Sequence, residues 1–100
     1  MYMESKTYID RMIDIYKHNT KVRCHLGKQF SDHVDNCSIT FKGIADATGI
    51  PYKTIVNVAK GAPVDILQLF KLCDVVYFNF GSAMEKAIEE TSKEPETEER

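Results

Sequence analysis

The segment FKGIADATGIPYKTIVNVAKG, residues Phe41–Gly61, decides the fold, because it predicts two short helices joined by a tight turn. Its apolar face is interrupted at Gly49, restarts at Ile50-Pro51, and continues at Ile55 and Val58 with a spacing of three. A turn between helices must leave the right-handed helical region, which glycine does without steric cost. Pro51 suits the first turn of a helix, where a backbone N–H would lack a partner. The segment therefore predicts a helix-turn-helix, whose second helix, residues 51–60, projects as a rod that fits a DNA major groove.

The order of small, glycine and apolar positions in this segment resembles the phage-repressor class of DNA-binding domains, also called Xre-like or lambda-repressor-like. The resemblance covers roughly residues 22–90. It implies sequence-specific binding of double-stranded DNA by a transcriptional regulator of the repressor type. The residues that carry it are Ala45, whose small side chain suits a close helix crossing, Gly49, Ile55, Val58 and Lys60-Gly61, followed by a leucine-rich helix over 65–77.

Composition is that of an ordinary globular domain. The chain has 100 residues, 43% hydrophobic and 28% charged, which is enough for one small core without a metal or disulfides. No apolar run approaches the roughly 20 residues that span a bilayer, and the N-terminus lacks the apolar core of a secretory signal. We therefore expect a cytoplasmic protein with no membrane partner, and no small-molecule ligand or cofactor is evident.

Hydrophobic spacing predicts helices on both sides of the central segment. Before it lie a helix over 4–18 with a broad apolar face and a helix over 21–36 with a narrow stripe; the sequence leaves open whether they are continuous through Asn19. After it lie helices over 65–77 and 83–90. The broad face consists of Tyr8, Ile9, Met12, Ile13 and Tyr16, and the stripe consists of Val22, Leu26, Phe30 and Val34. As N-caps we predict Thr40 for the helix over 41–48, Asp65 for the helix after the central segment, and Ser82 for the last.

The predicted fold is all-α, a compact bundle of five to six helices with the helix-turn-helix at its centre. We assign residues 1–20 to an extra N-terminal helix, 21–90 to the repressor-like domain and 91–100 to an acidic tail. Residues 92–100, SKEPETEER, offer no apolar side chain to offset the entropy of ordering, so we expect the tail to be disordered. Residues 83–100 carry three basic and seven acidic groups, whereas residues 1–82 carry ten and eight, so the domain itself is nearly neutral.

The helix over 51–60 offers the residue types that read base edges. Lysine can donate to guanine, asparagine can pair with adenine, valine can meet a thymine methyl group, and tyrosine can reach a phosphate or a base edge. With Ile55 and Val58 inward, the outward candidates for base contact are Tyr52, Lys53, Val56 and Asn57. The resemblance adds phosphate contacts at the flanks of the helix, which correspond to Thr40, Lys42, Lys60 and the Gly61 amide, and Thr54 is a further candidate.

Two clusters outside this helix have competing interpretations. Lys17, Lys21 and Lys28, with His18, Arg23 and His25, could form a phosphate-facing ridge, but we favour a solvated helix surface. Three cysteines, Cys24, Cys37 and Cys73, form no C-x-x-C pair, and we expect free buried thiols. His33 and Cys37 lie four apart, with Cys24 and His25 nearby, but one loose pair is not typical of zinc sites, so we predict no metal.

The chain contains no catalytic motif, so we expect no enzyme. The predicted function is therefore the binding of a partner. A homodimer is expected, since repressor-class proteins read two half-sites and the apolar face of the first helix is broad. The alternative is a protein-interaction module, in which the same fold binds another protein such as an antitoxin or anti-repressor partner. Near-neutral charge and the acidic tail favour this alternative.

Overall fold

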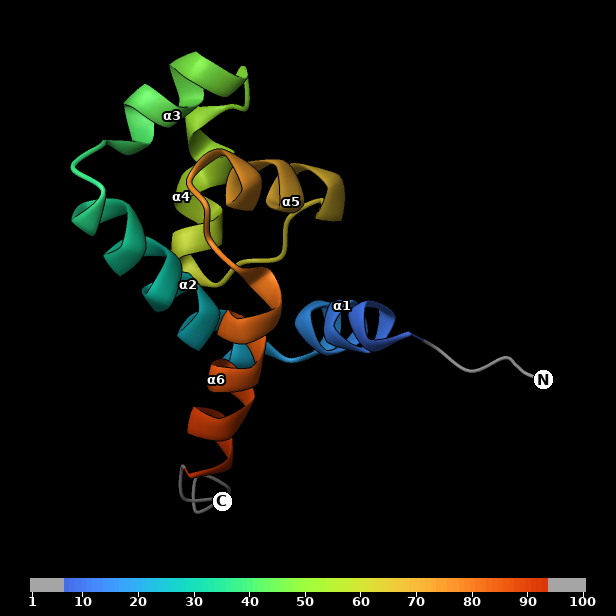
Figure 1. Cartoon of the computed structure of the whole chain (residues 1–100). Helices are drawn as coiled ribbons and strands as arrows, with labels where there is room; N and C mark the ends of the chain where they lie inside the picture. Colours follow the sequence, from blue (N-terminus) through green and yellow to red (C-terminus); the bar gives the residue numbers. More distant parts are fainter. Residues whose placement is uncertain (1–6, 94–100) are drawn as a thin grey trace.

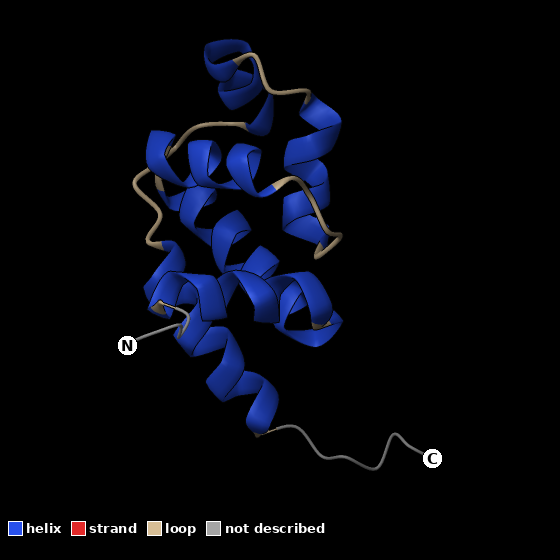
Figure 2. Cartoon of the chain, turned by 90° about the vertical axis from the view of Figure 1, so that its right-hand side faces the viewer, coloured by secondary structure: helices blue, strands red, loops and turns tan. Residues whose placement is uncertain are grey.

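Six α-helices make up residues 7–93, the part of the chain that the computed structural model describes (Figure 1). Short loops join them, and this part of the chain contains no strand (Figure 2). The all-α class and the count of six helices agree with the prediction. In chain order the helices are α1 (Tyr8–His18), α2 (Thr20–Asn36), α3 (Phe41–Thr48), α4 (Tyr52–Lys60), α5 (Ile66–Val75) and α6 (Phe80–Ser92).

Asn19 separates α1 from α2, which settles the question that the sequence left open. Its backbone is extended, with φ −131° and ψ 101°, and its side chain accepts a hydrogen bond from the Val22 N–H at 3.0 Å. The residue therefore ends one helix and caps the next. Thr7 caps α1 in the same way, accepting from the Asp10 N–H at 3.1 Å. Positions 4–6, where we predicted the helix to begin, lie outside the described residues.

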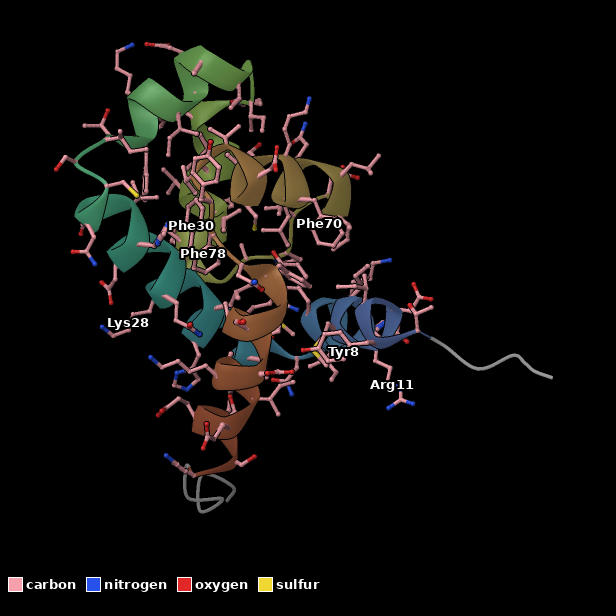
Figure 3. All side chains as sticks on the ribbon, in the orientation of Figure 1. Tyr8, Arg11, Lys28, Phe30, Phe70 and Phe78 are labelled. Atoms are coloured by element: carbon pink, nitrogen blue, oxygen red, sulfur yellow. The ribbon has the colours of Figure 1, made fainter. Side chains whose placement is uncertain are left out.

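Helix α2 supplies the centre of the core, and its predicted stripe is confirmed. Val22, Leu26, Phe30 and Val34 are all buried. The Phe30 ring meets the edge of Phe78 at a centroid distance of 5.6 Å and stacks with Phe41 at 6.2 Å (Figure 3). Because α4 and α6 both pack on α2, the stripe fixes the position of α4 in the molecule.

Only part of the broad apolar face of α1 is buried. Met12 and Tyr16 belong to the core, whereas Tyr8 and Ile9 stay exposed. The Tyr8 hydroxyl donates to the Glu85 carboxylate on α6, and this bond raises the pKa of Tyr8. The N-terminal helix is thus packed into the same core as the rest of the described chain.

The last helix differs from its prediction at both ends. Helix α6 begins at Phe80 and not at 83, because Asn79, not Ser82, is the N-cap and accepts from the Ser82 N–H at 2.9 Å. Phe80 in the first turn is buried, and its ring lies 5.1 Å from that of Phe70. The helix continues to Ser92, so the predicted tail boundary at 91 is wrong by two residues. Residues 94–100, the remainder of that tail, lie outside the described residues.

Candidate nucleic-acid interface

Local hydrogen bonds cap the start of α3 and build the turn between α3 and α4, and the Thr40 cap and the Gly49 turn are as predicted. Thr40 caps α3, its hydroxyl oxygen accepting from the Gly43 N–H at 2.9 Å. Gly49 ends α3 in the left-handed region, with φ 78°, and its N–H donates to the Ala45 carbonyl at 2.9 Å. The Thr48 hydroxyl accepts from the Ile50 N–H at 3.1 Å. The Gly49 and Thr48 bonds fix the direction in which the chain leaves α3.

Pro51 precedes α4 instead of forming its first turn. Its φ of −58° suits a helix, but its ψ of 139° does not, so the helix begins at Tyr52. The Pro51 carbonyl accepts from the Thr54 N–H at 2.9 Å and starts the helical hydrogen-bond pattern. The predicted range of 51–60 is therefore one residue too long.

Helix α4 presents a stripe of three polar side chains and one valine on its outer side. Its inward residues are as predicted, since Ile55 and Val58 are buried. The stripe follows the spacing i, i+3, i+4, i+7 and spans about 10 Å along the helix axis. Its two ends are exposed lysines and its two middle positions are half-buried, and α4 contains no acidic side chain. We call this set, Lys53, Val56, Asn57 and Lys60, the α4 stripe.

The other two α4 candidates lie beside this stripe. Tyr52, at the start of the helix, is 55% exposed. Thr54 is half-buried and lies outside the stripe. The four predicted base-contact residues are thus on the accessible side of α4. Tyr52 and Lys53 are exposed, whereas Val56 and Asn57 are half-buried.

The predicted phosphate contacts differ in how accessible they are. Thr40, Lys42 and Lys60 are exposed. Lys42 already pairs with Asp46 one turn later, with 3.5 Å between the Lys42 ammonium and the carboxylate. The Thr40 hydroxyl oxygen is engaged in the α3 cap, but its O–H remains a donor.

Gly61 does not have the accessible amide that the prediction required. It is buried, with φ 85°, and its N–H donates to the Val58 carbonyl at 3.2 Å as part of the cap that ends α4. A Cβ added here would lie 2.8 Å from the Cys24 Cα and Sγ atoms. In this conformation Gly61 serves the packing of α4 on α2, and the Val58 carbonyl engages its N–H.

A close helix crossing lies at Gly27, which the sequence interpretation missed. A Cβ on Gly27 of α2 would lie 2.5 Å from the backbone oxygens of Val58 and Ala59 in α4. Ala45, the small residue predicted for a crossing, is half-buried against the core. An isolated glycine inside a helical pattern was the signal that could have located this contact.

Arg23 is the second missed residue, and it does not belong to a phosphate-facing ridge. It is only 7% exposed. Its guanidinium donates to the Tyr16 carbonyl at 2.8 Å and the Lys17 carbonyl at 3.0 Å in the last turn of α1, and to the Gly61 carbonyl at 2.9 Å beyond α4. Helix C-termini carry partial negative charge, so two helix ends stabilise this buried cation. Arg23 thereby ties α1 and α4 to α2.

A groove separates the exposed side of α3 from the start of α4. It has a volume of about 540 Å³ and is lined by Lys42, Ala45, Asp46, Ile50, Pro51 and Tyr52. Ile50 and Pro51 line it at the turn, and Lys42, Ala45 and Asp46 line it from α3. The groove gives the α3–α4 pair a second surface that could accept a partner.

Between residues 7 and 93 no group of three or more His, Cys, Asp or Glu is placed to hold a metal ion, and no helix is long and apolar enough to cross a membrane. His33 and Cys37, the pair weighed and discounted as a metal site, lie 3.7 Å apart between Nε2 and Sγ, and the His33 Nε2 is also 2.6 Å from the Val76 carbonyl oxygen. Cys24 and Cys37 are exposed, contrary to the expectation of buried thiols, and Cys73 is buried. The chain matches no family model, no curated protein and no solved structure.

Proposed function

We propose that the protein binds double-stranded DNA, with α3 and α4 acting as a helix-turn-helix and α4 entering the major groove. As a homodimer it would regulate transcription, most simply as a repressor. The observation that carries this proposal is the α4 stripe, in which two lysines bracket a small apolar and an amide side chain on a helix without acidic residues.

The chemistry of the stripe suits base recognition. Within the described residues the Asn57 side-chain amide has no hydrogen-bond partner, so it is available to pair with both N6 and N7 of adenine. Lys53 is exposed one turn earlier and can donate to guanine, and Val56 between them can meet a thymine methyl group. Tyr52, at the start of the helix, can reach a phosphate or a base edge. A bidentate contact contributes about 1–3 kcal/mol of discrimination between bases.

Phosphate contacts would come from both sides of the helix. Lys60 lies at the far end of the stripe, and Lys42 and Thr40 lie at the start of α3. The pair between Lys42 and Asp46 is exposed, and such pairs contribute only about 0–1 kcal/mol, so a phosphate can replace the carboxylate at little cost. Thr54 remains a secondary candidate, and the buried Gly61 is left out of the proposed set.

The test compares base-reading and phosphate-binding variants on duplex DNA. Asn57→Ala or Lys53→Ala should cost about 1–3 kcal/mol and relax the preference at one or two base pairs. Lys60→Ala should weaken binding to all duplexes alike and make the salt dependence shallower by about one phosphate contact. Lys86→Ala, an exposed lysine on α6, is the matched control and should change neither quantity. Equal affinity of wild type and Asn57→Ala for every duplex would refute base reading by Asn57.

A second candidate function is favoured by the groove beside Tyr52. Its Ala45, Ile50 and Pro51 offer apolar area, and Tyr52 is an aromatic residue of the kind that anchors protein interfaces. In that case the α3–α4 pair would bind another protein instead of DNA. DNA binding through several phosphates must weaken steeply as salt rises, whereas an apolar interface need not, so the salt dependence separates the two.

A further inference from the structure

The outer face of α5 exposes large apolar side chains at both ends and charges between them. Leu67, in the first turn, is 77% exposed, and Tyr77, just beyond the helix, is 90% exposed. Lys71 and Asp74 lie between them along the chain, on the same helix face as Leu67 because they follow it by four and seven residues, and both are exposed. Among the described residues neither of these two charges has an ion-pair partner. We call these four residues the α5 face.

Tyr77 holds its exposed position at a conformational cost. Its φ is 57°, in the left-handed region that glycine prefers and bulky residues seldom adopt. Its N–H donates to the Asp74 carbonyl at 3.3 Å, and the Phe78 N–H donates to the Cys73 carbonyl at 2.8 Å, which is a Schellman end to α5. Glycine would fit this position better. A strained tyrosine whose ring contacts solvent is a candidate interface anchor.

An apolar recess lies beside the C-terminal half of α5. It has a volume of about 330 Å³ and lies between α5, the segment that follows it and Ile9 of α1. Phe70 points from α5 toward α1 (Figure 3), and Phe78 and Asp74 complete this side of the recess. Figure 1 shows α5 and α1 on the same side of the molecule, so a partner that covers α5 can also reach this recess.

We propose that the α5 face binds a second copy of this chain, with the two α5 helices antiparallel about a two-fold axis that passes between Lys71 and Asp74. Lys71 of each copy then faces Asp74 of the other. The same symmetry brings Leu67 of each copy to the C-terminal end of the other α5, where Tyr77 and the recess lie. Leu67 precedes Lys71 by about 6 Å along the axis. Tyr77 lies just beyond the helix end that follows Asp74, so the apolar ends and the charges can meet together.

The order of side chains along α5 favours a second copy over a different partner. A two-fold interface requires that one patch complement itself. The α5 face does so, because it carries one positive and one negative side chain at its centre and an apolar side chain at each end. This inference gives the proposed homodimer its contact surface, but it invokes no DNA contact.

The test is a charge exchange followed by sedimentation equilibrium without DNA, so failure of the interface is told apart from failure of DNA binding. The wild type should dimerise. Lys71→Asp alone and Asp74→Lys alone each place like charges opposite one another twice, and each should weaken the dimer at least about tenfold. An equimolar mixture of the two variants should recover association as a heterodimer. Lys86→Asp on α6 is the matched control and should dimerise as the wild type does.

Tyr77→Gly separates folding from association. Glycine suits the left-handed position, so thermal stability at low protein concentration should be kept or raised while the dimer weakens. A wild type that stays monomeric up to about 1 mM would overturn the proposal. The proposal would also be overturned if Lys71→Asp or Tyr77→Gly changed the dimer affinity no more than Lys86→Asp does. Failure of the mixed charge variants to associate would overturn it as well.

Discussion

Replacing Gly27 by alanine should destabilise the fold by forcing α2 and α4 apart. The added Cβ would lie 2.5 Å from the Val58 and Ala59 carbonyl oxygens, whereas ordinary contact begins near 3.4 Å. The two helices must therefore separate by about 0.9 Å, and no rotamer change can help because both oxygens belong to the backbone. Overpacking of this kind costs about 1–3 kcal/mol.

Alanine also gains about 1 kcal/mol of helix propensity over glycine, and this gain must be separated from the steric cost. Gly43→Ala in α3 is the matched control. A Cβ on Gly43 meets only the Thr40 side-chain oxygen, at 3.3 Å, and a small shift of that side chain relieves the contact. Gly43→Ala should therefore be neutral or stabilising. The two substitutions share the gain in helix propensity. The difference between their free energies of unfolding therefore measures the steric cost at the crossing of α2 and α4.

Chemical and thermal unfolding followed by circular dichroism are the assays. Gly27→Ala should be less stable than Gly43→Ala by about 1–3 kcal/mol. For a domain of this size that difference corresponds to a melting temperature lower by about 4–8 °C for each kcal/mol. If Gly27→Ala were as stable as Gly43→Ala, α2 and α4 would not cross as closely as described, and the position assigned to α4 would be wrong.

The remaining predictions concern buried groups. Arg23→Met should lower the free energy of unfolding by about 2–4 kcal/mol, because three backbone carbonyls lose their hydrogen-bond donor. Arg23→Lys should recover only part of this lost free energy. Urea unfolding of both variants measures the two effects. Burial raises the pKa of Cys73 to about 12, so alkylation of the native protein at about pH 8, followed by mass spectrometry, should label Cys24 and Cys37 and spare Cys73. The folded form keeps the Cys73 proton to higher pH than the unfolded form does, so the free energy of unfolding should fall as pH rises from 9.0 toward about 12. Over this pH range the wild type should lose more stability than Cys73→Ala.

Local signals were sufficient to predict most of the helices. Thr40 and Asp65 cap the helices that follow them, and Gly49 ends α3 in the left-handed region, because each of these depends on hydrogen bonds within a few residues. The four-residue stripe of α2 is buried as predicted. The start of α6 was missed because Asn79 and Ser82 are both possible caps, and the cap at Asn79 brings Phe80 into the first turn, where its ring packs on residues distant in sequence.

The site was less predictable than the fold, because it depends on which helix ends converge. Arg23 looked like part of a basic helix surface, and only the meeting of the α1 and α4 C-termini shows why it is buried. Gly61 looked like an available amide, yet α2 covers it at Cys24. The outward residues of α4 were predictable, since helical periodicity and the inward positions of Ile55 and Val58 determine that face.

Selection of bound fragments from random duplex DNA at low salt tests the central claim most directly. If α4 reads bases, the selected duplexes should share a common sequence, and Asn57→Ala with unchanged helix content and melting should select with a relaxed preference at one or two of its positions. Affinity for the shared sequence should fall steeply between about 50 and 200 mM salt. Failure of the wild type to retain any duplex at low salt would contradict DNA binding and favour the protein-interaction function.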